Sequence, residues 1–174
     1  MKGRTNMDKN IFLIGFMGAG KSTVARVLSD RLNMSLVEMD SRIVKEQGMS
    51  INEIFEKFGE NHFRDIESKL VMDIKNEGNK VVSCGGGVVV REENVACMKE
   101  NGTIVFLSAT PETIYNRVKD SKERPILNGN MNIEYISGLM EKRRTLYEGA
   151  ADIKIDTDKK TVAQICEEIE SQLK

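Results

Sequence analysis

The chain has 174 residues and a mass of 19.6 kDa, which is close to the size of one ordinary domain. Its 26 basic and 27 acidic side chains give a formal net charge of −1, which argues against a protein that binds nucleic acid without sequence preference. Hydrophobic residues make up 40% of the chain and only two prolines occur, so the composition excludes a disordered chain.

The cysteines and apolar runs indicate where the protein works. The three cysteines lie far apart and form no C-x-x-C pair, so neither a disulfide framework nor a zinc site is expected. The apolar run Ile11–Ile14 is far too short to cross a membrane, and no signal-peptide pattern opens the chain. We therefore expect a cytoplasmic protein with no membrane segment. Residues 1–9 are polar and without periodicity, and they are predicted to be a disordered leader.

Short apolar runs predict strands. Two of them are unbroken, as expected for strands that are covered on both faces in a parallel sheet. The last run alternates between apolar and polar residues, which suits an edge strand. The predicted strands lie, in chain order, at Ile11–Ile14, Leu36–Val37, Val81–Val82, Ile104–Leu107 and Ile153–Ile155.

Helical patterns lie between these runs, marked by apolar residues at i, i+3, i+4 spacing and by capping residues. Five helices are predicted: one after Lys21, one from Ser50 to near Gly59, one over about 61–77, one that begins at Thr110–Pro111, and one from Val162 to Leu173. Strands that alternate with helices predict a parallel sheet with helices on both faces and right-handed crossovers. We expect residues 10–174 to form one domain. The stretch 119–132 has few apolar residues and predicts a mobile lid.

The segment Gly15–Ser22, GFMGAGKS, fits the phosphate-binding pattern G-x-x-x-x-G-K-[ST] in full. It follows the first predicted strand and precedes an amphipathic helix, as the pattern requires. Its backbone N–H groups and the helix N-terminus are expected to hold phosphates, with Lys21 on the β and γ phosphates and Ser22 on Mg²⁺. No N-K-x-D sequence for guanine is found. Motors and large ATPases usually have a hydrophobic strand that ends in Asp, whereas the third predicted strand here is followed by Ser83, Cys84 and three glycines. The sequence therefore favours a small-molecule kinase.

A second group of residues points to the phosphate acceptor. The glycine triplet 85–87 follows a strand, at the edge where open parallel sheets bind ligands. Glu38 and Asp40 end the second strand, where alternation aims both to one side, although a carboxylate there could also be a solvated loop residue or a helix cap. Arg64 and Arg143 are candidate clamps for a carboxylate, with ordinary surface arginines as the alternative.

Two more residues complete this group. Glu67 lies three residues after Arg64, so an ion pair on a helix could hold that arginine in its working rotamer. Arg124 lies in the predicted lid and is a candidate transition-state arginine that arrives when the lid closes.

These motifs together resemble the shikimate kinase family, and the resemblance covers nearly all of the chain after the leader. The segments that carry it are GFMGAGKST at 15–23, EMD at 38–40, IFEKFGENHFRDIE at 54–67, SCGGG at 83–87, ERPIL at 123–127 and RRTLY at 143–147. The resemblance implies a three-layer α/β/α fold of the nucleoside monophosphate kinase type, with a five-stranded parallel sheet. It also implies transfer of the γ-phosphoryl group of ATP to the 3-hydroxyl group of shikimate, with Mg²⁺ as cofactor, in aromatic amino-acid biosynthesis.

The resemblance also assigns roles to residues. It implies that Asp40 binds the shikimate hydroxyls and acts as base, that Arg64 and Arg143 grip the carboxylate, and that Ser22 is the metal ligand. The implied catalytic set is Lys21, Asp40 and Arg124. The other implied substrate contacts are Gly85, Gly86 and Gly87. The implied ATP site comprises Gly18, Ala19, Gly20, Lys21, Ser22, Thr23, Arg117 and Arg124.

One departure from the family pattern concerns Glu38, which stands where the first acid is usually Asp, so it is left out of the expected catalytic core. Cys84 is expected to be a small packed residue, with a reactive thiol as the alternative. His62 is expected on the surface or in packing. Gluconate or another small metabolite as acceptor, and a silent nucleotide-binding regulatory module, stay open as alternatives. We expect a monomer that binds neither nucleic acid nor membranes.

Overall fold

A parallel sheet of five strands forms the centre of the computed structural model, which describes residues 9–120 and 132–174. The strand order across the sheet is β2-β3-β1-β4-β5. The strands are β1 (Asn10–Ile14), β2 (Ser35–Glu38), β3 (Lys80–Ser83), β4 (Gly102–Ser108) and β5 (Ile153–Asp156). All five predicted strands are confirmed. Arg124, the leader up to residue 8 and most of the predicted lid lie outside the described residues.

Strand β1 lies in the middle of the sheet. All five of its residues are buried and four of them are apolar, as expected for a strand that is covered on both faces. Phe12 pairs with Val82 of β3 on one side and with Ile104 of β4 on the other. Strand β5 lies at the edge, and its residues alternate between buried and exposed. The distinction between unbroken and alternating runs therefore predicted the positions of β1 and β5 correctly.

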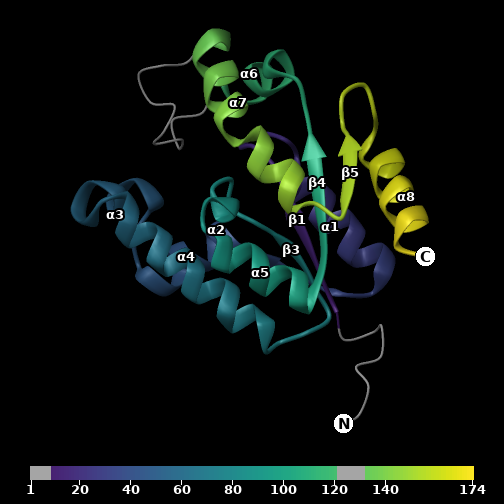
Figure 1. The fold of residues 1–174 in the computed structure, drawn as a ribbon, viewed down its shortest axis with the longest axis horizontal. Coiled ribbons are helices and arrows are strands. Elements are labelled where there is room, and N and C mark those ends of the chain that lie inside the picture. Colours follow the sequence, from purple (N-terminus) through teal and green to yellow (C-terminus); the bar gives the residue numbers. More distant parts are fainter. Residues whose placement is uncertain (1–8, 121–131) are drawn as a thin grey trace.

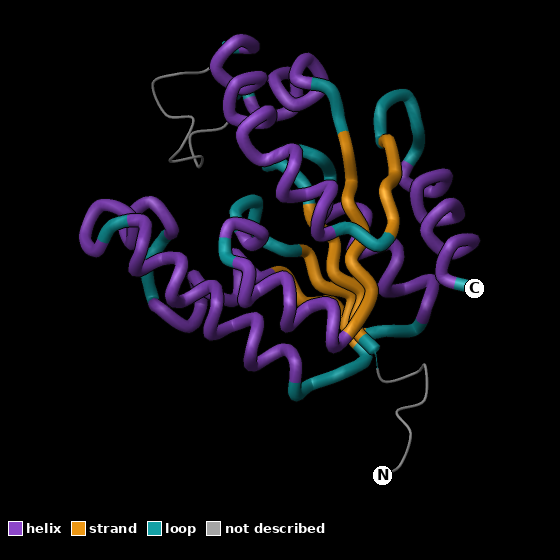
Figure 2. Tube along the Cα trace, in the orientation of Figure 1, coloured by secondary structure: helices purple, strands orange, loops and turns teal. Residues whose placement is uncertain are grey.

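Helices cover both faces of the sheet (Figures 1 and 2). Helices α1 and α8 pack together on one face, and α4, α5 and α7 lie on the other. The helical elements are α1 (Lys21–Leu32), α2 (Met39–Gln47), α3 (Ile51–Phe58), α4 (Glu60–Lys75), the 3-10 turn η2 (Val88–Val90), α5 (Glu92–Asn101), α6 (Pro111–Val118), α7 (Ile133–Ala150) and α8 (Val162–Leu173). This is the predicted three-layer arrangement. The apolar spacing did not indicate α2, α5 or α7.

The start of α2 corrects one expectation. Strand β2 ends at Glu38, and α2 begins at Met39, so Asp40 lies in the first turn of a helix rather than at the end of a strand. The prediction that strand alternation aims Glu38 and Asp40 to one side was therefore wrong in its geometry. The short distance between the two residues still brings both of them to the same cleft.

Side-chain caps begin several helices where the sequence indicated them. Ser50 accepts a hydrogen bond from the Glu53 amide at 3.1 Å, and Thr110 accepts one from the Thr113 amide at 3.3 Å. These two contacts confirm the predicted starts of α3 and α6. Helix α8 has a complete capping box that the sequence analysis did not single out.

None of the helices in the described ranges has a long enough apolar stretch to span a lipid bilayer.

The capping box of α8 makes a testable contribution to stability. Thr161 Oγ1 accepts from the Gln164 amide at 3.1 Å, and Gln164 Oε1 accepts from the Thr161 amide at 2.8 Å. Thr161→Ala removes the first contact and is expected to lower the free energy of unfolding by about 1 kcal/mol, or about 2–4 °C in Tm by calorimetry. Thr161→Ser keeps the hydroxyl and should melt close to the unsubstituted protein. Equal melting of the alanine and serine variants would contradict the cap.

Candidate active site

A cleft of about 360 Å³ lies where the segments that follow β1, β2 and β3 meet. These strands are neighbours in the sheet and parallel, so their carboxyl ends open onto one edge. The predicted site residues that line the cleft are Gly18, Gly20, Lys21, Ser22, Thr23, Asp40, Arg64, Gly85, Gly86, Gly87, Arg117 and Arg143. Ala19 is buried in the phosphate loop, and its amide donates to the Phe16 carbonyl at 3.1 Å.

The phosphate loop presents an open helix N-terminus to this cleft. Gly20 is the N-cap of α1, and neither a side-chain cap nor an acidic residue occupies the first turn. The first N–H groups of the helix therefore keep their capacity to bind an anion. Lys21 extends its amine back over the loop, where Nζ donates to the carbonyl oxygens of Gly15 at 2.6 Å and Phe16 at 3.0 Å. This arrangement suits a polyphosphate.

Arg117 lies on the other side of the loop, near the C-terminal end of α6. Its guanidinium Nη1 donates to the Gly18 carbonyl at 3.0 Å, and its side chain is exposed. A flat, exposed guanidinium beside the phosphate loop can contact a nucleotide by stacking or by hydrogen bonding. The structure therefore brings Arg117, which the resemblance assigns to the ATP site, beside the phosphate loop.

Oxygen atoms suited to a magnesium ion gather beside Ser22. Its hydroxyl lies 3.4 Å from that of Ser83, and Ser83 pairs in register with Glu38. The Glu38 carboxylate lines the cleft, and its buried Oε1 atom has no hydrogen-bond partner. Within the described ranges no three His, Cys, Asp or Glu side chains cluster as a metal site. The oxygen donors fit Mg²⁺ held jointly with nucleotide phosphates, which is how Mg²⁺ is usually bound.

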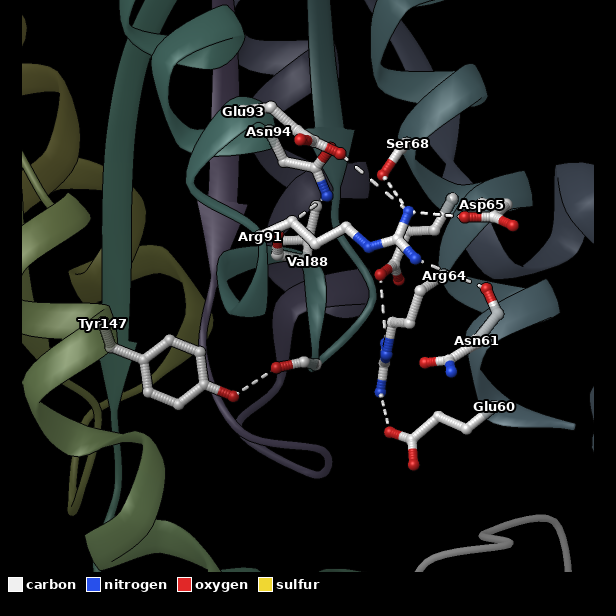
Figure 3. A network of polar contacts seen from close by, with 12 residues as sticks. Glu60, Asn61, Arg64, Asp65, Ser68, Val88, Arg91, Glu93, Asn94 and Tyr147 are labelled. Carbon is white, nitrogen blue, oxygen red and sulfur yellow. Dashed lines mark hydrogen bonds and ion pairs between the residues drawn. The ribbon is translucent and has the colours of Figure 1, made fainter.

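Arg64 is buried on α4 at the wall of the cleft, with 5% of its surface exposed (Figure 3). Its Nη1 donates to Glu67 Oε1 at 3.0 Å, and its Nη2 donates to Glu60 Oε1 at 3.2 Å. The predicted Arg64–Glu67 ion pair is confirmed, and the alternative of a surface arginine is excluded. Burial raises the pKa of Glu67, and the positive charge of Arg64 opposes that shift.

The glycine triplet fits tightly against these charges. A Cβ atom at Gly87 would overlap the Arg64 guanidinium. A Cβ atom at Gly85 would lie 2.5 Å from Glu67 Oε2 and 3.1 Å from Asp40 Oδ1. Only residues without a side chain allow the turn after β3 to approach the two buried ions so closely. The triplet is therefore part of the cleft and more than a tight turn.

Arg143 faces Arg64 from the opposite wall, on α7. Its guanidinium lies over the Phe16 ring, 6.0 Å from the centroid, and its Nη1 is 3.6 Å from the Cβ position of Gly86. Two arginines from helices far apart in sequence thus converge on one turn. Together they form a cationic recess beside the phosphate loop, suited to a small carboxylate.

Some contributors to the cleft were missed or undervalued from the sequence. Glu67 was expected only as a partner of Arg64, but its Oε2 atom is buried without a partner inside the cleft wall. Glu38 was left out of the expected catalytic core, although it lines the cleft as Asp40 does. Tyr147 was not considered; it does not line the cleft, but its hydroxyl donates to the carbonyl of Gly86, which does. The spacing of four residues between Tyr147 and Arg143 on a helix was a signal that could have found it.

The remaining expectations concern Cys84 and His62. Cys84 is 3% exposed, and burial raises its pKa far above the usual range for a thiol, so the packed residue is confirmed and the reactive thiol is not supported. His62 is exposed, with its ring 4.7 Å from that of Phe58. The surface position predicted for His62 is confirmed.

Comparison with known proteins gives one consistent family. The family model described as shikimate kinase matches residues 17–174. A shikimate kinase of Sulfurihydrogenibium sp. is 44% identical over 166 residues, covering 95% of this chain and 98% of that protein. A shikimate kinase of Dehalococcoides mccartyi is 42% identical over 165 residues, covering 95% and 93%. The structure of Acinetobacter baumannii shikimate kinase in complex with shikimate superposes with a TM-score of 0.92 at 30% identity, covering 97% and 94%.

The buried thiols generate a prediction about reactivity. Cys84, Cys97 and Cys166 are all buried, and burial raises the pKa of each thiol. Ellman's reagent should therefore find no rapidly reacting thiol in the folded protein and three thiols after unfolding in guanidinium. Ser171→Cys, on the exposed end of α8, serves as the positive control and should add one fast-reacting thiol. Fast labelling that disappears in Cys84→Ser would show an accessible Cys84.

Proposed function

The chain belongs to the shikimate kinase family, and we propose that it transfers the γ-phosphoryl group of ATP to the 3-hydroxyl group of shikimate through the cleft described above. The observation that carries this proposal is the position of Arg64 and Arg143, which converge beside the phosphate loop. A carboxylate anchored there leaves the rest of a small acid within reach of the nucleotide phosphates. The product is shikimate 3-phosphate, as required for aromatic amino-acid biosynthesis.

We infer that the substrate carboxylate binds to the two guanidinium groups and to backbone N–H groups of the triplet Gly85–Gly87. Arg64 is held in place by Glu67 and Glu60, so little of its side-chain freedom remains to be lost on binding. The glycine turn presents its backbone without side-chain obstruction. These contacts fix the orientation of the ring and with it the position of the reacting hydroxyl group.

Asp40 is the proposed base. Its carboxylate faces the turn at Gly85, on the side of the cleft between the glycine triplet and the phosphate loop. There it can hydrogen-bond the attacking hydroxyl and accept its proton during an in-line transfer. Lys21 neutralises charge on the transferred phosphoryl group, because its amine already lies at the loop that would hold the phosphates. No covalent intermediate on the protein is required.

Mg²⁺ is the proposed cofactor, held by the Ser22 hydroxyl, by the nucleotide phosphates and, on its outer side, by Glu38. When bound, it supplies positive charge that offsets the developing charge on the phosphates. The unpartnered Glu38 oxygen and the neighbouring Ser22 and Ser83 hydroxyls support this assignment. Glu38 carries one methylene more than the Asp usual at this position, so its carboxylate can extend further from the backbone of β2 than that of Asp would.

Several finer assignments stay predictions. Arg117 is proposed to contact the adenine, and its position beside Gly18 supports this role. Arg124 and the lid at 119–132 are proposed to close over ATP and exclude water, but they fall largely outside the described residues. We also propose a cytoplasmic enzyme that acts as a monomer.

The acceptor can be tested by ADP release with Mg-ATP, comparing shikimate, gluconate and no acceptor. We expect ADP release that depends on shikimate. Arg143→Ala should raise the KM for shikimate about 10- to 150-fold, the loss expected for a hydrogen bond to a charged group, and leave the KM for ATP nearly unchanged. Arg143 is the better residue to replace, because removing Arg64 would leave the buried Glu67 charge unpaired.

Arg144→Ala is the matched control for this experiment. Arg144 is adjacent in sequence, and its side chain is 60% exposed and paired with Glu141 at the surface. Its replacement should leave the KM for shikimate unchanged. Activity with gluconate alone would show that the protein phosphorylates another class of acceptor. ATP binding without turnover on any acceptor would favour a regulatory module.

Asp40→Asn tests the base. The substitution keeps the size of the side chain and its ability to hydrogen-bond, but it removes most of the proton affinity. We expect kcat to fall about 10²-fold or more while the shikimate Kd, measured by calorimetry without ATP, changes little. Asp73→Asn, at an exposed position on α4 away from the residues that line the cleft, is the control and should retain full turnover. Turnover of Asp40→Asn near the unsubstituted value would rule out Asp40 as proton acceptor.

A further inference from the structure

The glycine turn is fastened from two sides, by α7 and by α4 (Figure 3). On the α7 side, the hydroxyl of Tyr147 donates a hydrogen bond to the carbonyl of Gly86. On the α4 side, Arg91 follows η2 and binds Asp65 at 2.8 Å and Ser68 Oγ at 3.3 Å. The two attachments differ in position. Arg91 holds the chain after the turn, whereas Tyr147 holds the central residue of the turn itself.

Tyr147 is a rigid attachment. Its side chain is buried, with 2% of the residue exposed, and its ring stacks on Phe106 of β4 with centroids 5.1 Å apart and planes at 20°. A ring packed in this way has little freedom to rotate or to shift along the sheet. The hydroxyl is therefore presented at a fixed point relative to β4, and the Gly86 carbonyl is held at that point.

Because the Gly86 carbonyl is held in place, the direction of the neighbouring Gly87 N–H donor is also fixed. The Gly86 carbonyl and the Gly87 N–H belong to one planar trans peptide, in which the two groups point in opposite directions. Because the carbonyl points to Tyr147 on α7, the Gly87 N–H points away from α7, towards the side where Arg64 approaches Gly87. Glycine residues on both sides of this peptide would otherwise allow it to rotate at low cost.

The same helix carries one arm of the cationic recess. Arg143 precedes Tyr147 by four residues on α7, so both side chains project from one face of the helix. The Arg143 Nη1 atom lies 3.6 Å from the Cβ position of Gly86. The Tyr147 hydrogen bond thus connects the helix that carries Arg143 to the turn that faces it.

The phenol is kept in the form that can donate. Burial raises the pKa of Tyr147, and the neighbouring Arg143 charge opposes this shift without reversing it. The hydroxyl therefore stays protonated through the neutral and mildly alkaline range.

We propose that Tyr147 is a positioning residue for substrate binding: its hydroxyl sets the Gly86–Gly87 peptide so that the Gly87 N–H and the Arg143 guanidinium converge on the same carboxylate. Tyr147 does not contact the substrate in this proposal. It acts through the turn, and the inference rests on the proposed binding of shikimate in this cleft.

Tyr147→Phe tests the proposal because it removes the hydroxyl and keeps the ring that stacks on Phe106. We expect the KM and Kd for shikimate to rise about 3- to 10-fold, the loss of one buried hydrogen bond, with kcat within about twofold and the KM for ATP unchanged. Tyr115→Phe, a partly buried tyrosine on α6 that is not among the residues lining the cleft, is the matched control and should change none of these constants.

A second measurement follows the peptide directly. In ¹⁵N-labelled protein, the Gly87 amide signal should shift on addition of shikimate, and this shift should be reduced in Tyr147→Phe. If Tyr147→Phe lowers the Tm and the number of active sites but leaves the KM and Kd for shikimate unchanged, Tyr147 has only a packing role and the proposal is overturned. A Gly87 signal that does not respond to shikimate in the unsubstituted protein while shikimate binds would also overturn it. Failure of the unsubstituted protein to bind shikimate would instead contradict the proposed function.

Discussion

The buried positive charge of Arg64 is the constraint on which the cleft depends. A guanidinium removed from water destabilises the fold unless it is paired, and Glu67 on the same helix provides the pairing. The pair occupies the space where the side chains of residues 85 and 87 would otherwise lie, so both of these positions must be glycine. The Nε atom of Arg64 is likewise buried at this wall, without a hydrogen-bond partner. Charge, turn and helix are thus fitted to one another, and none can change alone.

Sheet topology converts this local fit into a working site. The order β2-β3-β1 places three segments next to one another: the junction of β2 and α2 with Glu38 and Asp40, the glycine turn, and the phosphate loop. These segments are separated by long stretches of sequence. Helices α4 and α7 then each contribute one arginine to the cleft, Arg64 from α4 and Arg143 from α7. Positioning rather than bond-making is the main task of a phosphoryl-transfer site, and the parallel sheet performs that task through the fixed spacing of its strand ends.

Features with a local physical origin could be predicted from the sequence. The unbroken and alternating apolar runs identified all five strands, the capping residues identified the starts of α3 and α6, and the phosphate loop followed from residues adjacent in the chain. Features that depend on distant partners could not. The start of α2 at Met39 overrode the expected alternation, the burial of Glu67 depends on the loop at Gly85, and the partner of Tyr147 lies 61 residues away. Each of these requires the tertiary structure, because no local pattern encodes it.

The open N-terminus of α1 has a thermodynamic consequence. Helices α3, α6, α7 and α8 each complete their first turn with a side chain, whereas α1, like α2, α4 and α5, has no such cap; the first turn of α1 lies at the phosphate loop and has no acidic residue. The nucleotide thus takes the place of a cap, and part of the stability of the folded enzyme becomes a function of ligand concentration. By mass action, a ligand present at a hundred times its Kd adds about 2.7 kcal/mol to the free energy of unfolding. The abundance of the enzyme in a cell would then follow the nucleotide supply, since chains that lack ligand unfold and are degraded more often.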